Sequence, residues 1–504
     1  ALTLNNSHGL IQNGDIIVPT TLTLTIGEYS IGANTLTING AISTSSGTLN
    51  GGSTSNIVLG GSGASTILPV VSLNNLTLNR ANGISLGGDV TVAGILALTA
   101  GTLTIGANTF TISGSSPTRV SGNIDASNSS ATMVLTNPST ITCPESIFTN
   151  SINNFTINGA GISACCSCTI NGILNLQSAN PSSTMGTLDM GTNTLTMGEN
   201  ATTIGIGDVT GIVKREHTFS TNTEYSFGSQ YTTFTFIDAN TKPTWISVKI
   251  SIGAVPTWSP WTPAPNGKVK RLYQVASSDN ASTAQTNINM RYLPTELDAT
   301  YNDETKLIFW HKMTGYESGA PHEHGKSNQD FANHTIGVTG LAFGTAATTD
   351  LDDSQIAIAY SVTTKNTWKG EVVGHETEWE QAQNWTSGHV PLSTEEVLIP
   401  GGLTYYPSLT AAASAVAKTI EIEIGASITA NSYDITVSGF GGAWINLGTF
   451  NAGTGKVIFN HGVSAEIVTI AGVTNFYDIE VGVNTSMQPV PGNILRIAGA
   501  GTAD

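Results

Sequence analysis

Histidine and acidic side chains gather in the stretch HKMTGYESGAPHEHGKSNQDFANH, which spans residues 311–334. His-x-His spacing places two imidazoles on one face of a strand, and imidazole is a common metal ligand. The later stretch DLDDSQ offers alternating carboxylates, which suit calcium. DLDDSQ is not a complete calcium-binding loop, and solvated polar loops are the simpler interpretation of both stretches. No cofactor is therefore firmly expected, and calcium is the one that we consider for these stretches. The candidate ligands are His322, His324, His334, Asp350, Asp352 and Asp353.

The four cysteines form a second group able to do chemistry: Cys143, Cys165, Cys166 and Cys168. Cys143 and Cys165 are about one coil apart in the repeat described below, which predicts a disulfide between neighbouring coils and a local link within 165–168. Disulfides are the usual state of cysteines in exported proteins. Zinc is the alternative, although Cys165 and Cys168 supply only one CxxC half-site.

Tryptophans occur in two clusters. Trp258 and Trp261 lie in the proline-rich stretch PTWSPWTPAP, where exposed rings could stack on sugars or pack against a sheet edge. Trp368, Trp379 and Trp385 lie close together before the strand-like segment EEVLIP. We expect these three to cap the open end of a second repeat region, which would otherwise expose unpaired strand edges.

Catalytic groups are sparse. The first 206 residues contain few acidic side chains, at no fixed spacing that would place two carboxylates together as polysaccharide-cleaving enzymes require. Arg80, Arg119 and His8 add little to this set. No phosphate loop, dinucleotide fingerprint or nucleophile elbow is present. The sequence therefore predicts a protein that is not an enzyme.

The elements that must position these groups are short strands. One short segment, which we call the refrain, recurs along the chain. It occurs as IGANTLTING at 31–40, as IGANTFTISG at 105–114 and as MGTNTLTMGE at 190–199. Apolar residues alternate with Thr, Ser and Asn, which is the period of a strand with one buried face. No helical segment separates the strands, so we expect the chain to coil with about 20–25 residues per turn. An antiparallel hairpin array is the alternative, because Asn-Gly also marks hairpins.

The overall fold class is therefore predicted as all-β. We expect a right-handed parallel β-helix, then an antiparallel β-sandwich of Ig-like or jelly-roll type, then a second short β-solenoid. The sandwich assignment rests on aromatic alternating strands such as YTTFTF and WISVKISI. The predicted domains are the β-helix at 1–206, the sandwich at 207–365, and the Trp-rich cap with the second solenoid at 366–504.

Composition limits the function classes. The 504 residues carry a formal net charge of −17, which argues against nucleic-acid binding. No run of 18 apolar residues exists, so no membrane-spanning helix is expected. The chain starts without the charged and apolar segments of a signal peptide, so we expect either that one has been removed or that this is an internal piece.

The run from the tryptophan cluster through EEVLIP to NAGTGKVIFN, together with the refrain, resembles modular secreted and cell-surface proteins of Bacteroidetes exported by the type IX system. The stretch from VKRLYQV to LIFWH is similar to the sandwich modules of those proteins. The resemblance covers nearly the whole chain through repetitive motifs. It implies export, attachment to the outer surface or release, and a stalk, fibre or adhesin role. The sorting domain of that export route is not visible here.

These observations predict a non-enzymatic, extracellular structural protein that forms a subunit or stalk of a surface fibre, sheath or surface layer. Its expected partners are copies of itself, assembled head-to-tail or laterally. The first alternative is an adhesin that recognises surface glycans through Trp258, Trp261 or the histidine-rich loop. The second alternative is a polysaccharide-degrading β-helix enzyme.

Overall fold

The computed structural model divides into two compact units. Unit 1 comprises residues 1–219, 225–233 and 244–251, and unit 2 comprises 220–224, 234–243 and 252–504. The structure describes residues 1–164, 166–177, 186–253, 265, 267–278, 284–313, 322–326, 328–343, 351, 354–361, 365–410, 415–462, 467–483, 485–489 and 495–497.

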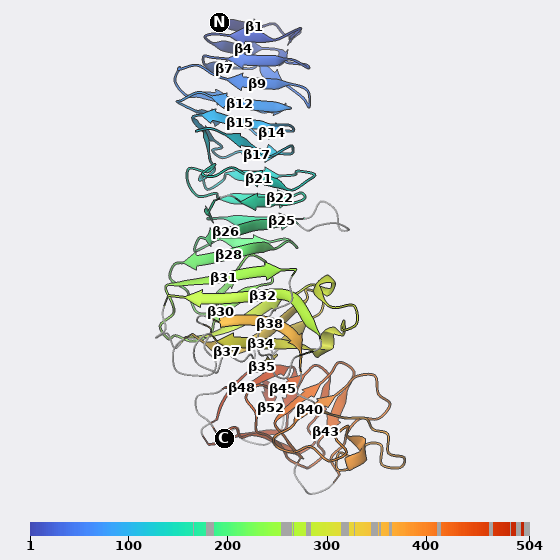
Figure 1. Cartoon of the computed structure of the whole chain (residues 1–504). Helices are drawn as coiled ribbons and strands as arrows, with labels where there is room; N and C mark the ends of the chain where they lie inside the picture. The colour runs from blue at the N-terminus through green and yellow to red at the C-terminus, as the bar shows by residue number, and fades with distance from the viewer. Residues whose placement is uncertain are drawn as a thin grey trace. The chain divides into compact units, whose positions relative to one another are not determined.

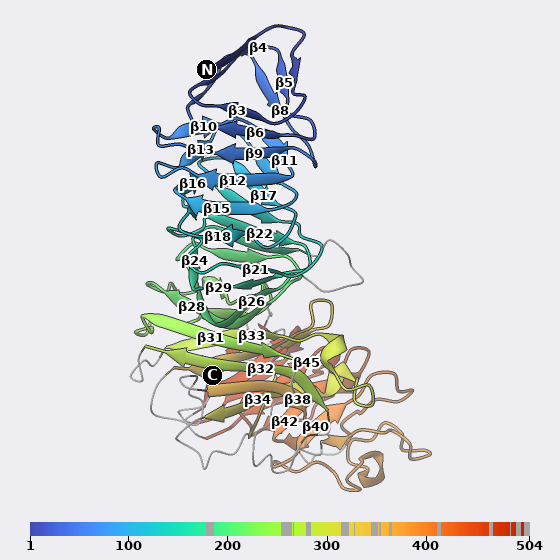
Figure 2. The same ribbon diagram turned by 45° about the horizontal axis from the view of Figure 1, so that its top comes forward.

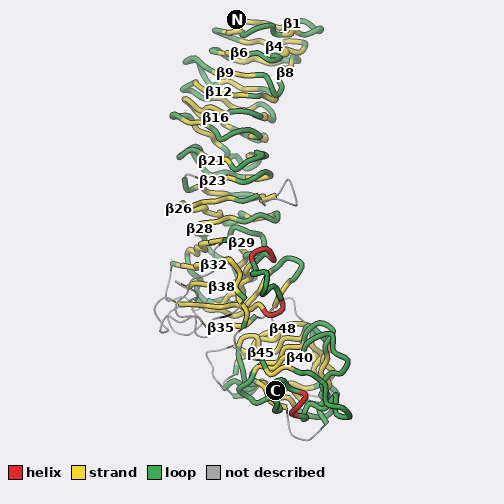
Figure 3. Tube along the Cα trace, turned by 45° about the vertical axis from the view of Figure 1, so that its right-hand side comes forward, coloured by secondary structure: helices red, strands yellow, loops and turns green. Residues whose placement is uncertain are grey.

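Almost all regular structure among the described residues is β-strand. The helical elements among these residues are three short 3-10 helices, drawn in red in Figure 3: η1 (Pro294–Glu296), η2 (Glu304–Lys306) and η3 (Ala382–Asn384). The fold is therefore all-β, as the sequence predicts.

Unit 1 is a parallel β-solenoid, drawn from blue to green in Figure 1. Figure 2 shows the first coils with strands β3, β4 and β5 on separate sides. Leu76 pairs with Ile57 of the preceding coil and with Leu96 of the following coil, in parallel register. The described ladders from β1 to β28 are parallel, which confirms the predicted solenoid and excludes the hairpin alternative for this region.

The strands of unit 1 fall into successive sheets. The first coils form β1 (Leu2–Asn5), β4 (Leu22–Ile26) and β7 (Ile42–Thr44), and beside them β2 (Leu10–Ile11), β5 (Glu28–Ser30) and β8 (Thr48–Asn50). A six-stranded sheet contains β3 (Ile16–Val18), β6 (Thr35–Ile38), β9 (Asn56–Leu59), β12 (Asn75–Asn79), β15 (Leu96–Ala100) and β18 (Thr118–Arg119). A four-stranded sheet contains β10 (Thr66–Leu68), β13 (Ile84–Leu86), β16 (Thr102–Thr104) and β19 (Asn123–Asp125).

The longest lateral run in unit 1 is a seven-stranded sheet: β11 (Val71–Leu73), β14 (Val90–Val92), β17 (Thr109–Ile112), β20 (Thr132–Leu135), β22 (Asn154–Asn158), β25 (Ile173–Gln177) and β27 (Thr202–Ile204). Another sheet begins with β21 (Ile141–Cys143), β23 (Ile162–Ala164), β24 (Cys168–Ile170), β26 (Leu188–Met197) and β28 (Val209–Glu216). Strand β28 then pairs antiparallel with β31 (Trp245–Ile252), so parallel coiling ends at β28.

The refrain is a corner of the solenoid. The Nδ2 of Asn34 donates to the carbonyl of Ile31 in its own coil at 3.0 Å and to that of Gln12 in the preceding coil at 2.9 Å. Asn108 makes the equivalent two bonds at 2.9 Å. Gly32, two residues before the first asparagine, has a φ of 64°, which side chains rarely adopt. The refrain therefore repeats because the asparagine at each of these corners is hydrogen-bonded to the preceding coil.

Alternation fills the core of unit 1. In β9 and β12 the leucines and the isoleucine are buried, and the residues between them, including Val58, are partly or fully exposed. Because successive side chains point to opposite faces, each coil contributes its Leu, Ile and Val to one shared interior. A single coil could not bury that face alone, which explains the sequence repetition.

Unit 2 begins with two antiparallel sheets. One contains β32 (Lys268–Ser277), β38 (Ser354–Tyr360), β34 (Leu307–Met313) and β35 (His322–Gly325). The other contains β33 (Gln285–Arg291), β37 (Thr335–Ala342) and β36 (Asn328–Asp330). Two further strands, β29 (Glu224–Ser226) and β30 (Thr233–Phe236), contain residues of both units. We refer to the described residues from 265 to 361 as the antiparallel part of unit 2.

The described residues from 365 to 497 form a second parallel solenoid. Its main sheet contains β39 (Asn366–Thr367), β40 (Glu396–Ile399), β42 (Thr419–Ile422), β45 (Gly441–Asn446), β48 (Ile467–Gly472) and β51 (Ser486–Pro489). A second sheet contains β41 (Ala415–Ala417), β44 (Ile435–Val437), β47 (Lys456–Phe459) and β50 (Asp478–Val481). The shorter pairs are β43 (Ser427–Thr429) with β46 (Thr449–Asn451), and β49 (Thr474–Phe476) with β52 (Leu495–Ile497).

Candidate functional site

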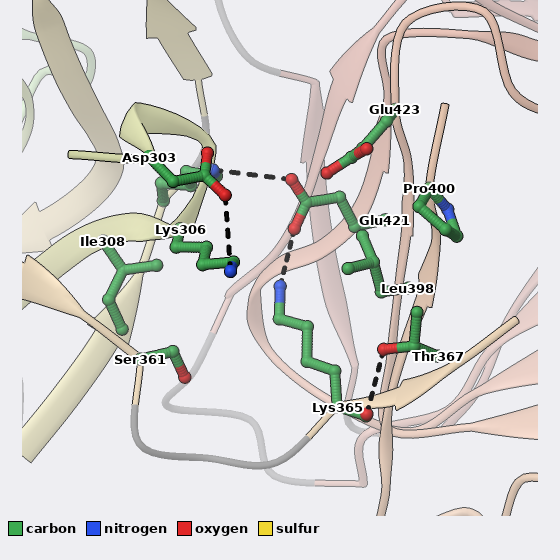
Figure 4. A pocket seen from close by; sticks show the side chains of 11 residues that line it. Asp303, Lys306, Ile308, Ser361, Lys365, Thr367, Leu398, Pro400, Glu421 and Glu423 are labelled. Atoms are coloured by element: carbon green, nitrogen blue, oxygen red, sulfur yellow. Dashed lines mark hydrogen bonds and ion pairs between the residues drawn. The ribbon is translucent and has the colours of Figure 1, made fainter. Parts of the chain in front are cut away.

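A cavity of about 440 Å³ lies in unit 2, where the antiparallel part meets the second solenoid (Figure 4). Its wall combines three acidic and three basic side chains with apolar and hydroxyl groups. The lining residues are Asp303, Lys306, Ile308, Lys326, Ser361, Lys365, Thr367, Leu398, Pro400, Glu421 and Glu423.

The main sheet of the second solenoid presents one side of this cavity. Glu421 in β42 pairs laterally with Leu398 on one side and Ile445 on the other, and Ile445 pairs with Ala471. These side chains lie on the outer face of the sheet, opposite the solenoid core. Solvent would normally cover such a face. Here Glu421, Ile445 and Ala471 are each at most 5% exposed.

The antiparallel part covers this face. Strand β37 lies against β45 and β48, and β35 lies against β45. The approach is close at Gly442 in β45, because any side chain there would collide with the carbonyl oxygen of Lys326. We call the outer surface carrying Glu421, Ile445 and Ala471 the covered face.

Three charged side chains meet beside the covered face, and we call them the ionic cluster: Lys326, Lys365 and Glu421. Lys365 Nζ lies 2.6 Å from Glu421 Oε2, and Lys326 Nζ lies 3.5 Å from Glu421 Oε1. Figure 4 shows the Lys365 ammonium group directed at the Glu421 carboxylate. Lys326 immediately follows β35, Lys365 immediately precedes β39, and Glu421 belongs to β42. Three separate segments therefore converge on one carboxylate.

The electrostatics of the cluster follow from its burial. Burial alone would raise the pKa of Glu421, but the charges and hydrogen bonds of Lys365 and Lys326 outweigh it and lower the pKa to about 2. Burial lowers the pKa of Lys326, with the charge of Glu421 opposing this effect and that of Lys365 adding to it. The two ammonium groups share one carboxylate. Lys326 is held less tightly than Lys365, because its Nζ lies farther from the nearest Glu421 oxygen. Glu421 is therefore ionised at neutral pH and cannot act as a proton donor there.

A hydrogen-bonded chain continues from the cluster into the antiparallel part. Lys326 Nζ donates to Gln329 Oε1 at 2.9 Å, and Gln329 Nε2 donates to Tyr292 Oη at 3.1 Å. Tyr292 in turn donates to Glu304 Oε2 at 2.6 Å. Burial, followed by the bond to Glu304, raises the pKa of Tyr292. His334 Nδ1 lies 2.9 Å from the same Glu304 oxygen.

This chain contains one of the predicted metal ligands, His334. His322 and His324 belong to β35, but the positions of their side chains are outside the described part, as are Asp350, Asp352 and Asp353. Among the described residues, no group of three or more His, Cys, Asp or Glu side chains is arranged to hold a metal ion. The predicted calcium and other metal sites stay predictions.

Of the two predicted tryptophan clusters, one lies within the described residues and the other does not. Trp258 and Trp261 lie outside the described residues. Trp368, Trp379 and Trp385 are buried in the hydrophobic core of the second solenoid. Trp385 contacts both others edge-on, with ring centres 5.0 and 4.7 Å away, and its Nε1 donates to the carbonyl of Trp379 at 2.8 Å.

No disulfide joins any two of the described cysteines, Cys143, Cys166 and Cys168, and Cys165 lies outside the described residues. The local link predicted within 165–168 does not join Cys166 to Cys168, and a link through Cys165 stays a prediction. Cys143 pairs laterally with Ala164. The predicted staple between Cys143 and Cys165 involves a residue outside the described part, so it stays a prediction. Burial, followed by the nearby Cys166, raises the pKa of Cys168 to about 12, which keeps this thiol protonated.

Sequence reasoning missed the ionic cluster. Glu421 and Glu423 appear in TIEIEIG as ordinary outward residues of an alternating strand, and nothing local indicates that this face is covered. The structural role of Arg80 was not predicted either. Its guanidinium is fully buried and donates to the carbonyls of Gly40, Gly60 and Ala64, which fastens successive coils of unit 1 together.

Comparisons with protein-family models, with curated proteins and with solved structures found no match to this chain. Within the described residues, no helix is both long and apolar enough to cross a bilayer. The argument for function therefore rests on the geometry alone.

Proposed function

We propose that this chain is a non-enzymatic structural protein of the cell exterior, serving as a subunit or stalk of a surface fibre, sheath or surface layer. The carrying observation is the uninterrupted lateral pairing in the seven-stranded sheet of unit 1. Each coil adds about 4.8 Å to such a stack, so length is the property that the repeated sequence supplies.

The outer surface of that sheet supports the same proposal. One lateral row runs across six strands without a charge, and most of its members are small hydroxyl side chains. This uncharged, regular surface suits packing against another copy of the chain, since no ion pair has to be desolvated. The row consists of Ser72, Thr91, Thr111, Val134, Thr156 and Asn175.

The charged cavity of unit 2 fits a structural role too. The two lysines of the ionic cluster, with Glu421 and the adjacent Glu423, balance in charge. The lysines hold Glu421 ionised, which removes it as a general acid at neutral pH.

Assembly of the purified full-length chain tests the proposal. Negative-stain electron microscopy and sedimentation over a range of concentrations should show ordered filaments or sheets. Thr111→Asp with Thr156→Asp places two charges on the uncharged row and should abolish lateral assembly while leaving the circular dichroism spectrum unchanged. A chain that remains monomeric at every concentration contradicts self-assembly.

A second candidate is an adhesin that binds a small glycan, and the cavity of about 440 Å³ favours it. A glycan array separates the two candidates. Saturable binding by a monomer, lost on filling the cavity with Thr367→Trp, supports the adhesin. Filaments without glycan binding support the structural protein.

A further inference from the structure

We propose that the ionic cluster is a latch that keeps the antiparallel part of unit 2 seated on the covered face of the second solenoid. The latch is distinct from lateral assembly, since the residues that carry it lie within unit 2. Its release would uncover a face that is otherwise almost fully shielded from water.

The connection between the two parts explains why a latch is needed there. The chain leaves the antiparallel part at Tyr360, the end of β38, and enters the solenoid at Asn366, the start of β39. Ser361 N donates to the carbonyl of Lys306 at 3.3 Å on one side, and Lys365 is held by Glu421 on the other. Only five residues, 361–365, separate β38 from β39, so contacts outside this connection must hold the antiparallel part on the solenoid.

Lys326 supplies that fixation. It immediately follows β35, far along the chain from β42, and its ammonium reaches Glu421 from the antiparallel side. Its backbone carbonyl meets Gly442 on the same sheet. Lys326 and Glu421 are both almost completely buried, so their attraction is weakly screened. Removing Glu421 would leave the buried ammonium group of Lys326 and the partly buried one of Lys365 without the carboxylate that they share.

The matched control is a second ion pair on the same sheet. Lys418 Nζ lies 3.1 Å from Glu396 Oε1 between neighbouring strands, but its lysine is 43% exposed and the pair joins the solenoid only to itself. Exposed pairs of this kind contribute little. Glu396→Gln therefore removes a carboxylate from the solenoid without touching the latch.

Trypsin cleavage after Lys365 reports the state of the latch in the full-length protein. We expect Glu421→Gln to speed this cleavage at least ten-fold and Glu396→Gln to change it less than two-fold. Lys326→Met is the second variant. It leaves Lys365 and Glu421 as a balanced pair, so the protein should fold, while the contact from the antiparallel part is lost and cleavage should rise several-fold.

Hydrogen exchange separates a latch from a general loss of stability. Release should accelerate exchange at least ten-fold in β45 and β48, which carry the covered face, and leave β47 and β50 of the second sheet within two-fold of the wild type. Equal acceleration in all four strands, or wild-type cleavage at Lys365 in folded Lys326→Met, overturns the proposal.

Discussion

The two solenoids of this protein are built from similar short strands but differ in how far the outer faces of those strands are exposed to solvent. In β9 and β12 of unit 1, buried and partly exposed residues alternate strictly. In β45 and β48 of unit 2, four consecutive residues are buried. The difference teaches that alternation reports what covers a sheet, because the backbone geometry is the same in both.

We expect the largest difference between the two solenoids in the free energy of unfolding when a charge is placed on the outer face. Ile445→Asp buries an unpaired carboxylate on the covered face and should lower the free energy of unfolding by about 4 kcal/mol. Val58→Asp places the same charge on the outer face of β9, where water reaches it, and should cost about 1 kcal/mol or less. Denaturant unfolding of both full-length variants measures the two values. Equal losses would break the distinction between the solenoids.

Acid should weaken the covered face through Glu421. Its pKa is about 2 in the folded protein against 4.5 for an ordinary glutamate, so its contribution is complete above about pH 4.5 and is lost as the pH falls through about 2. The gap corresponds to about 3 kcal/mol. Lys326, Lys365 and the neighbouring Glu423 face this carboxylate.

Glu421→Gln isolates this effect, because the variant retains every other carboxylate. Unfolding free energies measured from pH 7 to pH 2 should fall less steeply for the variant than for the wild type. Parallel curves would show that Glu421 does not contribute through its charge.

Close backbone packing gives the next effect. Gly442→Ala would force the new methyl group into the carbonyl oxygen of Lys326 and should cost about 2 kcal/mol. Gly52→Ala in unit 1 is the control, since no atom lies within 4 Å of the added carbon and its φ is not positive. Thermal unfolding compares them. An unchanged transition for Gly442→Ala would mean that the two parts of unit 2 can separate there without loss.

The smallest effect concerns the corners of the first solenoid. Asn108→Ala removes one bond within its coil and one to the preceding coil, and should cost about 1 kcal/mol. Asn82→Ala removes an exposed bond to the carbonyl of Gly63 and should cost less than about 0.5 kcal/mol. Denaturant midpoints rank the two. A loss for Asn82→Ala as large as that for Asn108→Ala would remove the special role of the refrain.

Much of the fold was predictable, because it depends on patterns among residues that are close together in the chain. The period of two fixes which residues of a strand share a face, and the refrain fixes where each coil turns, so parallel stacking followed from the sequence. The site was not predictable in the same way. Glu421 looks like Thr77 in its pattern, an outward residue of an alternating strand.

The amino-acid sequence by itself determined that this chain forms short alternating strands, that their apolar faces need stacking, and that Asn and Gly mark the corners. Those properties depend on residues close together in the chain. Only the tertiary structure decided that an antiparallel part covers one outer face of the second solenoid, and that Lys326, Lys365 and Glu421 meet beside it. Their encounter depends on segments about forty to a hundred residues apart, and the energy of a buried charge is set by what surrounds it in space.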